Sequence, residues 1–517
     1  MQSKDKFFSG QAEKFLSHKS RTHLFIISVL FIAAFAIRVY PIYKSPRLVG
    51  PRQYRCAIIA RDYFFETLQS IPDWERKIAS INKDAEGIYE PPIMELLASL
   101  GYRIAGGEYL WIPKMLSVIF WLGGGVFLYA LTRGLISSAA AIFSTAFYLF
   151  LPFGIAYSQS FAPDPLMLCL FIASIWAISR YHIQPSRTRL AIATALSAAA
   201  MFVKPVCLFA IFATFILANI SRQGIRKTLT DLNFILFGIG SFLPTALFYF
   251  YGIYVGTALR DVAEQSFFPS LYFSTAFWLG WLNQIDIVIG SITFILALWG
   301  VSLFREGLPR ALILGLWIGY VLFCLTFNEQ IHSYGYWNLQ LIPIVALSIA
   351  PVADLILSHL AQTWTQWQWR LAFLGLFLFL SLVSIREVRR EIRSKDPFPV
   401  KVAQEIGAIT QHSTNTILLS EEYGKILKYY GEISGKVWPS PWTFIERQIK
   451  GQPIPTAKER LDSLIRQFSP RYFIITAFEE YEDEQDLKQY LEGAFPIAKK
   501  TSDYLIFDLK KTKHLNE

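Results

Sequence analysis

Long apolar blocks separated by short basic segments are the feature that most constrains the fold of this 517-residue chain. Hydrophobic residues make up 53% of the sequence and charged residues only 17%, too few to cover the surface of a soluble protein of this size. The same numbers exclude a disordered chain. Because a helix of about 20 apolar residues crosses a bilayer core of about 30 Å, the pattern predicts a multi-spanning α-helical membrane protein.

The apolar blocks predict about eleven spans, with the N-terminus in the cytoplasm and the C-terminus outside. The candidate spans are 24–43, 113–132, 137–155, 164–180, 190–203, 206–219, 232–254, 285–304, 310–327, 338–357 and 370–386. The segment 190–219 is open to two interpretations, a single long span or two short spans that turn at Lys204-Pro205. Two spans keep the basic loops on the cytoplasmic side, as the positive-inside bias requires. With eleven spans, the basic run Arg386–Lys395 after the last span would lie outside, which the positive-inside bias disfavours.

The net charge and the cysteine and histidine content give no sign of nucleic acid or of a metal. The charge of 49 − 39 = +10 lies largely in loops between spans, where membrane topology explains it, so no nucleic-acid partner is expected. The four cysteines show no CxxC spacing, and three lie in apolar segments as small hydrophobic residues. The seven histidines form no HxxxH or HExxH motif. We expect no cofactor, and the sequence leaves a divalent metal open.

Composition divides the chain into three predicted regions. Residues 1–23 form a cytoplasmic tail, residues 24–386 a transmembrane domain, and residues 387–517 an extracytoplasmic soluble domain. The transmembrane domain includes a long first outer loop, 44–112, with helical patterning of its own. In the last region, helices alternate with strands at about 416–420, 471–476 and 504–509, which predicts a small α/β domain. It contains no GxGxxG motif and no P-loop, which argues against a nucleotide site there.

Two carboxylates stand where predicted helices start at the outer side of the membrane. Glu90 precedes Pro91-Pro92, and Asp164 lies in Pro163-Asp164-Pro165. Proline suits the first turn of a helix, and the helix dipole favours a carboxylate there. Glu90 and Asp164 could therefore have the purely structural role of stabilising the starts of their helices. A carboxylate at this interface could equally act as a catalytic base. The sequence leaves both interpretations open.

Basic residues in two outer segments are candidate phosphate ligands. Lys204 would lie at the outer tip of the predicted hairpin, where it could bind a lipid phosphate or extend toward lipid headgroups. Arg52 and Arg61 lie on a predicted helix of the first loop. Their guanidinium groups could bind phosphate through paired hydrogen bonds, or could only face solvent.

A polar aromatic segment precedes a late span, with His332, Tyr334 and Tyr336 close together. Interfacial aromatic belts explain Tyr and Trp at such a position without any function. A histidine between two spans is less easily explained in this way. A substrate contact is therefore the alternative interpretation for this segment.

These motifs together give a resemblance to a known group of enzymes. The chain resembles the polytopic glycosyltransferases of the protein O-mannosyltransferase type, the C-type fold of family thirty-nine and its bacterial relatives, which include the aminoarabinose transferases. The resemblance covers nearly the whole chain and is carried by short motifs. They are Glu90-Pro91-Pro92-Ile93, Pro163-Asp164-Pro165, Lys204, and the segment with His332, Tyr334 and Tyr336.

The chain departs from this family at one important place. Many relatives carry an acidic pair at the start of the first-loop helix, but this sequence has Arg52 and Gln53 there, ahead of Ala57 and Arg61. The resemblance therefore does not supply the usual catalytic base. Glu90 and Asp164 are its nearest substitutes.

The resemblance implies a membrane glycosyltransferase that moves a sugar from a polyprenyl-phosphate-linked donor to an acceptor hydroxyl on the extracytoplasmic face. We expect it in a plasma membrane, the inner membrane of a bacterium, with a glycan, lipid or protein acceptor and the bilayer as partners. The implied roles are catalysis for Glu90 and Asp164, donor-phosphate binding for Lys204, Arg61 and Arg52, and substrate binding for Gln53, His332, Tyr334 and Tyr336.

Two other classes of protein remain as alternatives. A transporter or flippase of lipid-linked saccharide would also span the membrane, but such proteins often show inverted repeats and polar, broken helices at mid-depth. No repeat is visible in this sequence, and charges at mid-depth are few. An inactive relative that only binds its ligand is the third possibility, raised by the missing acidic pair.

Overall fold

The chain forms two compact units. The computed structural model describes residues 20–44, 47–255, 259, 267–363, 365, 367–368, 371, 375, 386, 398–439 and 453–511. The membrane unit consists of Met1–Arg47, Ile88–Met94 and Leu110–Arg393, and the α/β unit of Leu48–Gly87, Glu95–Tyr109 and Ser394–Glu517. Most of the predicted first loop thus packs with the C-terminal residues in one unit.

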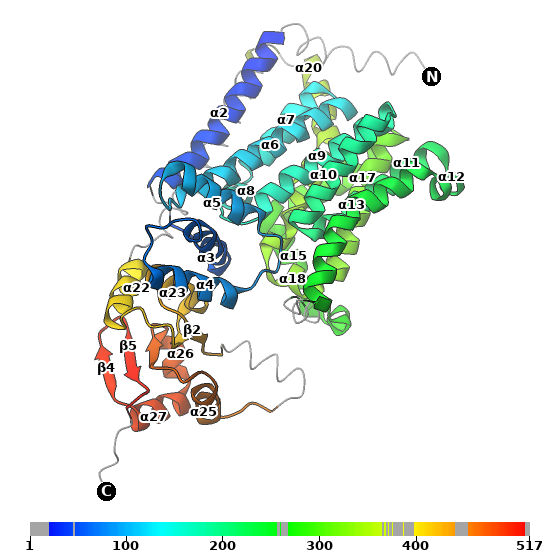
Figure 1. Ribbon diagram of the computed structural model, residues 1–517. Coiled ribbons are helices and arrows are strands. Elements are labelled where there is room, and N and C mark those ends of the chain that lie inside the picture. Colours follow the sequence, from blue (N-terminus) through cyan, green and yellow to red (C-terminus); the bar gives the residue numbers. More distant parts are fainter. Residues whose placement is uncertain are drawn as a thin grey trace. The chain divides into compact units, whose positions relative to one another are not determined.

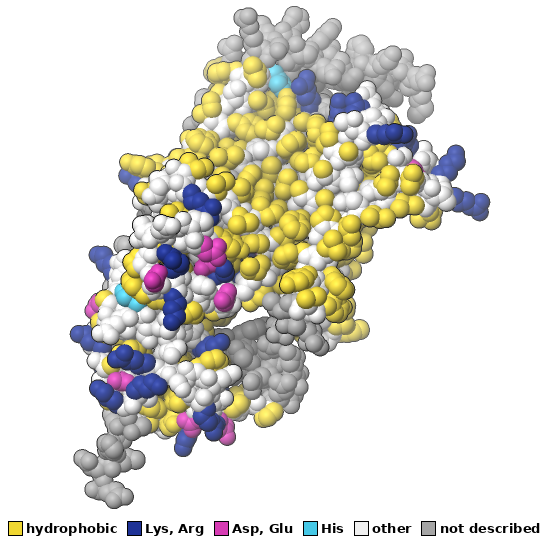
Figure 2. Space-filling model, in the orientation of Figure 1, with side chains coloured by type: hydrophobic (Ala, Val, Ile, Leu, Met, Phe, Trp, Pro, Cys, Tyr) yellow, Lys and Arg dark blue, Asp and Glu magenta, His cyan; other side chains and the backbone are white. Residues whose placement is uncertain are grey.

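Helices make up the described part of the membrane unit (Figure 1). They are α2 (Ser20–Lys44), α6 (Trp111–Leu135), α7 (Ser138–Phe150), α8 (Pro152–Tyr157), α9 (Asp164–Ile183), α10 (Arg187–Val203), η1 (Pro205–Cys207), α11 (Leu208–Gln223), α12 (Ile225–Thr230), α13 (Leu232–Phe250), η2 (Tyr251–Val255), η3 (Pro269–Phe273), α15 (Thr275–Ile289), α16 (Ser291–Ser302), α17 (Leu308–Thr326), α18 (Asn328–Ser333), η4 (Gly335–Asn338), α19 (Leu341–Ser348) and α20 (Ala350–Thr363). Hydrophobic side chains cover most of the visible face of this unit, and basic ones gather near α12 (Figure 2).

Within the described residues, seven helices are long and apolar enough to cross a membrane, and the bent pair α15–α16, which turns by 90°, would make eight. Two further predicted spans are shorter helices, α7 with 13 residues and α10 with 17. The predicted span 370–386 lies almost wholly outside the described residues. The multi-spanning helical architecture is confirmed, and the number eleven stays a prediction.

The break at Lys204-Pro205 forms a helical hairpin, as the charge pattern predicted. At one end, Lys204 binds Asp164, the first residue of α9. At the other end, the ring of Phe215 on α11 stacks on Tyr181 near the end of α9, with ring centroids 6.1 Å apart. Helix α11 therefore runs back alongside α9 and does not continue the direction of α10. Proline favours the break because its ring cannot continue a helix without losing a backbone hydrogen bond.

Close backbone contact holds the second arm of this hairpin against α17. Gly315 and Gly319 are four residues apart on one face of α17, in a GxxxG pattern. A Cβ atom at Gly319 would lie 2.2 Å from the Cα of Ala210, and one at Gly315 would lie 2.4 Å from the Cα of Thr214. Small residues allow helices to approach this closely in membranes, where packing and not the hydrophobic effect drives association. The contact fixes α11 directly after Lys204.

The α/β unit contains first-loop helices and a small mixed sheet. Its elements are α3 (Pro51–Phe65), α4 (Asp73–Glu86), most of α5 (Ile93–Ala105), α22 (Phe398–Ile409), β1 (Thr416–Leu419), η5 (Glu421–Gly424), α23 (Lys425–Tyr430), β2 (Gly435–Val437), α25 (Ala457–Phe468), β3 (Tyr472–Ile475), α26 (Phe478–Asp483), α27 (Gln485–Ala494), β4 (Ile497–Lys500) and β5 (Leu505–Asp508). The sheet order is β2-β1-β3-β5-β4. Strand β1 is parallel to β2 and β3, whereas β5 is antiparallel to β3 and β4.

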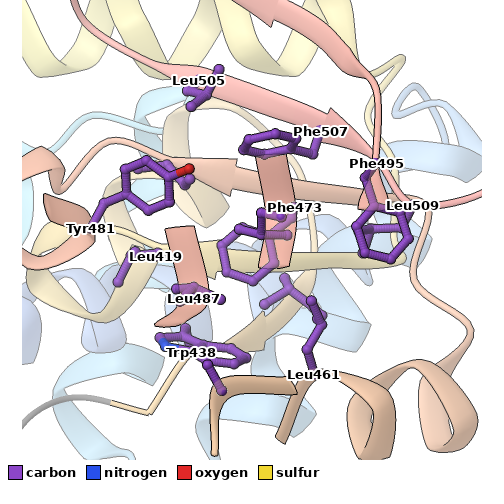
Figure 3. Close-up of a cluster of buried hydrophobic side chains, with 14 of the residues drawn as sticks. Leu419, Trp438, Leu461, Phe473, Tyr481, Leu487, Phe495, Leu505, Phe507 and Leu509 are labelled. Carbon is purple, nitrogen blue, oxygen red and sulfur yellow. The ribbon is translucent and has the colours of Figure 1, made fainter. Parts of the chain in front are cut away.

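The core of this sheet confirms the predicted small α/β domain. Fully buried rings of Phe473 on β3 and Phe507 on β5 lie among side chains from the covering helices, including Leu461 and Leu487 (Figure 3). Trp438 packs edge-on against Phe473, with ring centroids 5.4 Å apart. The three predicted strands correspond to β1, β3 and β5, each with an apolar run that burial explains.

The topology can be checked by labelling single cysteines from outside intact cells. The four native cysteines are buried and give a low background. We expect Asp84→Cys and Lys458→Cys to react with an impermeant maleimide, because the first loop and the C-terminal domain are predicted to lie outside. Arg187→Cys and Arg226→Cys should react only after permeabilisation. Protection of Lys458→Cys in intact cells would show that the number of spans before it is even, not odd.

Candidate active site

Lys204 is the centre of a buried charged cluster in the membrane unit. Its Nζ lies 2.8 Å from Oδ1 of Asp164 and 3.8 Å from Oε1 of Glu90. The side chains of Lys204 and Asp164 are each only 2% exposed, whereas that of Glu90 is 22% exposed. The structure therefore brings together three of the predicted site residues, and leaves only Glu90 partly open.

Local sequence explains how each of the three side chains is placed. Glu90 precedes Pro91-Pro92, and the backbone N–H of Ile93 donates to the carbonyl of Pro91 at 2.8 Å, which closes the turn into α5. Asp164 is the first residue of α9, with Pro165 in the first turn. Lys204 ends α10 in an extended conformation, directly before Pro205. Proline at each helix start thus determines where the charged residue beside it is held.

Aromatic rings enclose the ammonium group of Lys204. Its Nζ lies 5.0 Å from the ring centroid of Trp337 and 5.6 Å from that of Tyr336. These rings stand at cation–π distance and exclude water, which strengthens the charge pairing. Trp337 stacks in turn on Phe323 of α17, with centroids 6.1 Å apart. The sequence predicted Tyr336 at the site, but Trp337 was explained there by an interfacial belt.

The other two members of the late aromatic segment differ in their placement. Tyr334 packs beside Tyr336, with ring centroids 5.6 Å apart. The Nδ1–H of His332 donates to the carbonyl of Asn328 in the same helix at 2.8 Å, and its ring packs on Phe277 of α15, with ring centroids 5.6 Å apart. The ring contact joins α18 to α15. A substrate-binding role for Tyr334 and Tyr336 remains a prediction, and so does one for His332.

Arg52, Gln53 and Arg61 belong to the α/β unit, so the structure does not place them at the Lys204 cluster. The amide of Gln53 donates to the carbonyl of Val49 at 2.9 Å. Arg61 forms an ion pair with Glu108 at 2.9 Å. Burial lowers the pKa of Arg61, but the negative charge of Glu108 and the hydrogen bond that it accepts outweigh burial and raise it overall. Donor-phosphate binding by Arg52 and Arg61 remains a prediction, as does substrate binding by Gln53.

Arg38 is a functional candidate that the sequence analysis missed. This residue of α2 is completely buried, and its Nε donates to Oγ of Ser158 at 2.7 Å. Its two Nη atoms donate to the carbonyls of Leu149, at 2.7 Å, and Ala34, at 2.9 Å. Ser158 begins the short connection that leads to Asp164, so Arg38 holds that connection in place. An arginine within the apolar run 24–43 was the signal that could have found it.

Among the described residues, no group of three or more His, Cys, Asp or Glu side chains could hold a metal ion. The Lys204 cluster consists of a cation beside two carboxylates, with two aromatic rings next to the ammonium group. Such a set can bind an anion and accept a proton.

Comparison with known proteins agrees with the predicted resemblance. Residues 89–248 match the family model described as dolichyl-phosphate-mannose-protein mannosyltransferase. This segment is a little under a third of the chain and contains Glu90, Asp164 and Lys204. No curated protein matches the chain in sequence.

Solved structures share the fold over almost the whole chain. ArnT from Cupriavidus metallidurans bound to undecaprenyl phosphate has a TM-score of 0.59 at 13% identity, and the match covers 94% of this chain and 97% of that one. The apo oligosaccharyltransferase of Archaeoglobus fulgidus has a TM-score of 0.58 at 13% identity, with 93% and 73% covered. The C-type glycosyltransferase fold is thus confirmed, and the predicted enzyme class is that of the family model and of these neighbours.

The role of Arg38 can be tested by its removal. We expect Arg38→Met to lower the free energy of unfolding by about 1–3 kcal/mol, because the carbonyl of Leu149 and the hydroxyl of Ser158 lose a charged donor. Arg38→Lys should recover part of this loss, since an ammonium cannot reach all three acceptors. The measurement is thermal unfolding in detergent, with the exposed Arg310→Met as the control. Equal unfolding temperatures for Arg38→Met and Arg310→Met would contradict the structural role.

Proposed function

We propose that this protein is a membrane glycosyltransferase that transfers a sugar from a polyprenyl-phosphate-linked donor to an acceptor hydroxyl on the extracytoplasmic face. The observation that carries the proposal is the contact of one buried lysine, Lys204, with two carboxylates, Asp164 and Glu90. All three lie within the segment that matches the mannosyltransferase family model. The fold neighbours support the same chemistry, since ArnT is described bound to undecaprenyl phosphate and the archaeal enzyme AglB with dolichol-phosphate.

Lys204 is the residue suited to the donor phosphate. The phosphate leaves with a full negative charge, so a fixed cation near the bond that breaks lowers the barrier. The low exposure of Lys204 makes its charge effective, because little water screens it. Burial of an ammonium group within a membrane segment costs free energy, and such residues generally serve a function.

Glu90 is the better candidate for the base, and Asp164 for the residue that holds Lys204. Asp164 lies at full hydrogen-bond distance from the ammonium and is 2% exposed, so an acceptor has little access to it. Glu90 is 22% exposed and its closest oxygen is 1 Å further from the ammonium, 3.8 Å against 2.8 Å. A base must reach the proton that it removes, and this geometry favours Glu90.

The proposed reaction is a nucleophilic displacement at the anomeric carbon of the donor sugar. The acceptor oxygen forms a bond to that carbon while the bond from the carbon to the phosphate oxygen breaks. The hydroxyl proton passes to Glu90, and the bonding pair leaves with polyprenyl phosphate, whose charge Lys204 offsets. The acceptor is a hydroxyl of a glycan, a lipid or a protein, and the expected location is the inner membrane of a bacterium.

Replacement of Lys204 by methionine tests the donor site. Lys204→Met keeps the length of the side chain and removes its charge, so we expect the KM for the donor to rise about tenfold or more. The exposed Lys227→Met is a matched control and should leave the KM unchanged. The double variant Lys204→Met/Asp164→Asn removes both buried charges and tests the same point if the single variant is unstable. An unchanged donor KM in folded Lys204→Met would assign Lys204 to structure alone.

Replacement of the carboxylates tests the base. Glu90→Gln preserves size and most hydrogen bonds but cannot accept the proton, so kcat should fall by about 10²-fold or more. The affinity for the donor should change little. Asp164→Asn should raise the donor KM, because Lys204 loses its closest partner. Glu306→Gln, on an exposed loop, is the control. Full turnover in Glu90→Gln with a large loss in Asp164→Asn would reverse the two roles.

The same assay separates an enzyme from a transporter. Purified protein is mixed with a polyprenyl-phosphate-linked sugar and a hydroxyl acceptor in detergent, where transport cannot occur. A glycosylated product that Glu90→Gln fails to form supports the enzyme. If no product forms while vesicles containing the protein move the labelled lipid between leaflets, the flippase alternative holds.

A further inference from the structure

A carboxylate from the C-terminal part of the α/β unit lies at the start of the first-loop helix α3. The backbone N–H of Gly50 donates to Oε1 of Glu422 at 3.1 Å, across 372 residues of sequence. Gly50 is the residue that precedes α3, and Arg52 and Gln53 follow in the first turn. Both partners of the hydrogen bond belong to the α/β unit.

Helix α3 has no cap from its own sequence. Gly50 has no side chain to accept a hydrogen bond, and Pro51 at the next position has no N–H. The first N–H groups of a helix carry a partial positive charge and favour a carboxylate nearby. Glu422 therefore supplies, from a distant segment, an acceptor for the backbone N–H of Gly50 at this helix start.

The backbone that carries Glu422 is strained. Glu422 has a φ of 50° and Tyr423 a φ of 57°, both in the left-handed region, and Gly424 follows with a φ of 68°. Non-glycine residues in this region cost about 1 kcal/mol or more each, and they persist only where the surroundings determine them. A Cβ atom at Gly424 would lie 2.8 Å from Cδ1 of Leu418 on β1, so the turn is also tightly packed.

Two ion pairs fix the segment directly after this turn. Lys425 and Lys428 of α23 contact Glu86, at the end of α4, at 2.7 Å and 3.1 Å. Burial raises the pKa of Glu86, but the two ammonium groups outweigh burial and lower it overall, so this carboxylate is ionised at neutral pH. The amide of Asn82 also donates to the carbonyl of Ile433 at 3.0 Å. The C-terminal segment is therefore attached to the first loop on both sides of α23.

We propose that Glu422 is a positioning residue that holds the start of α3, and with it Arg52, in the geometry that the donor phosphate requires. The effect on the donor rests on the proposed glycosyl transfer, whereas the effect on α3 does not. The strained turn of the C-terminal domain and its ion pairs place the carboxylate, and the carboxylate fixes the first turn of the helix. The C-terminal domain thus fixes the predicted binding residue of the first loop.

Hydrogen exchange tests the structural half without any activity. Glu422→Gln keeps the size of the side chain and removes its charge, and the exposed neighbour Glu421→Gln is the matched control. We expect backbone amides of residues 50–55 in full-length Glu422→Gln to exchange about tenfold faster than in the native protein, because the first turn opens locally. Exchange in β1 and β3 should not change. Glu422→Asp, which keeps the charge, should restore part of the protection and replaces Glu422→Gln if that variant does not fold.

Kinetics test the functional half. Glu422→Gln should raise the KM for the donor several-fold and leave kcat unchanged, because Arg52 in the first turn of α3 is a predicted donor-phosphate ligand, with Glu421→Gln at native values for both. Unchanged exchange at residues 50–55 would overturn the positioning role whatever the kinetics show. Faster exchange with an unchanged donor KM would overturn the link to the donor. Faster exchange in a protein that transfers no sugar even in its native form would instead refute the proposed glycosyl transfer and leave Glu422 as the residue that holds α3.

Discussion

The contact between Lys204 and Asp164 is the interaction on which the arrangement of the membrane unit most depends. An ammonium group removed from water costs several kcal/mol unless it is well paired. The three charges of the cluster come from separate places: the connection before α5, the start of α9, and the break between α10 and α11. The hairpin at Pro205 and the proline-fixed helix starts are therefore required for the charges to meet. A straight helix through 190–219 would leave Lys204 in the middle of a span.

The surrounding helices hold this cluster by contacts that tolerate little change. Arg38 binds the connection before Asp164 from α2, and the glycines of α17 hold α11 close behind Lys204. Both are contacts of polar or small residues, because apolar side chains are stabilised equally well by lipid and give a membrane protein little specificity. The charged site is thus supported by the few residues in these helices that are not large and apolar.

The sequence indicated which candidate residues stand at helix ends, but it did not indicate which of them contact one another. Proline next to Glu90, Asp164 and Lys204 marked helix ends, a local signal that one sequence contains. The contact of Lys204 with Asp164 depends on how α9 and α10 pack, and no local pattern encodes it. The same holds for Arg61, whose carbonyl partner on Tyr429 lies 368 residues away. Strands β2 and β4 were missed because they are only three and four residues long and lack a buried apolar run.

The shared lysine also couples donor binding to the action of the base in the proposed reaction. Glu90 lies 3.8 Å from the ammonium of Lys204, so the charge attraction holds its carboxylate toward the lysine. A donor phosphate competes for the same ammonium, and each step by which Lys204 turns toward it weakens the pairing with Glu90. Asp164, at 2.8 Å, keeps Lys204 in place during this change. Glu90 would then be released toward the acceptor hydroxyl only once the donor is bound, so that donor binding precedes the action of the base.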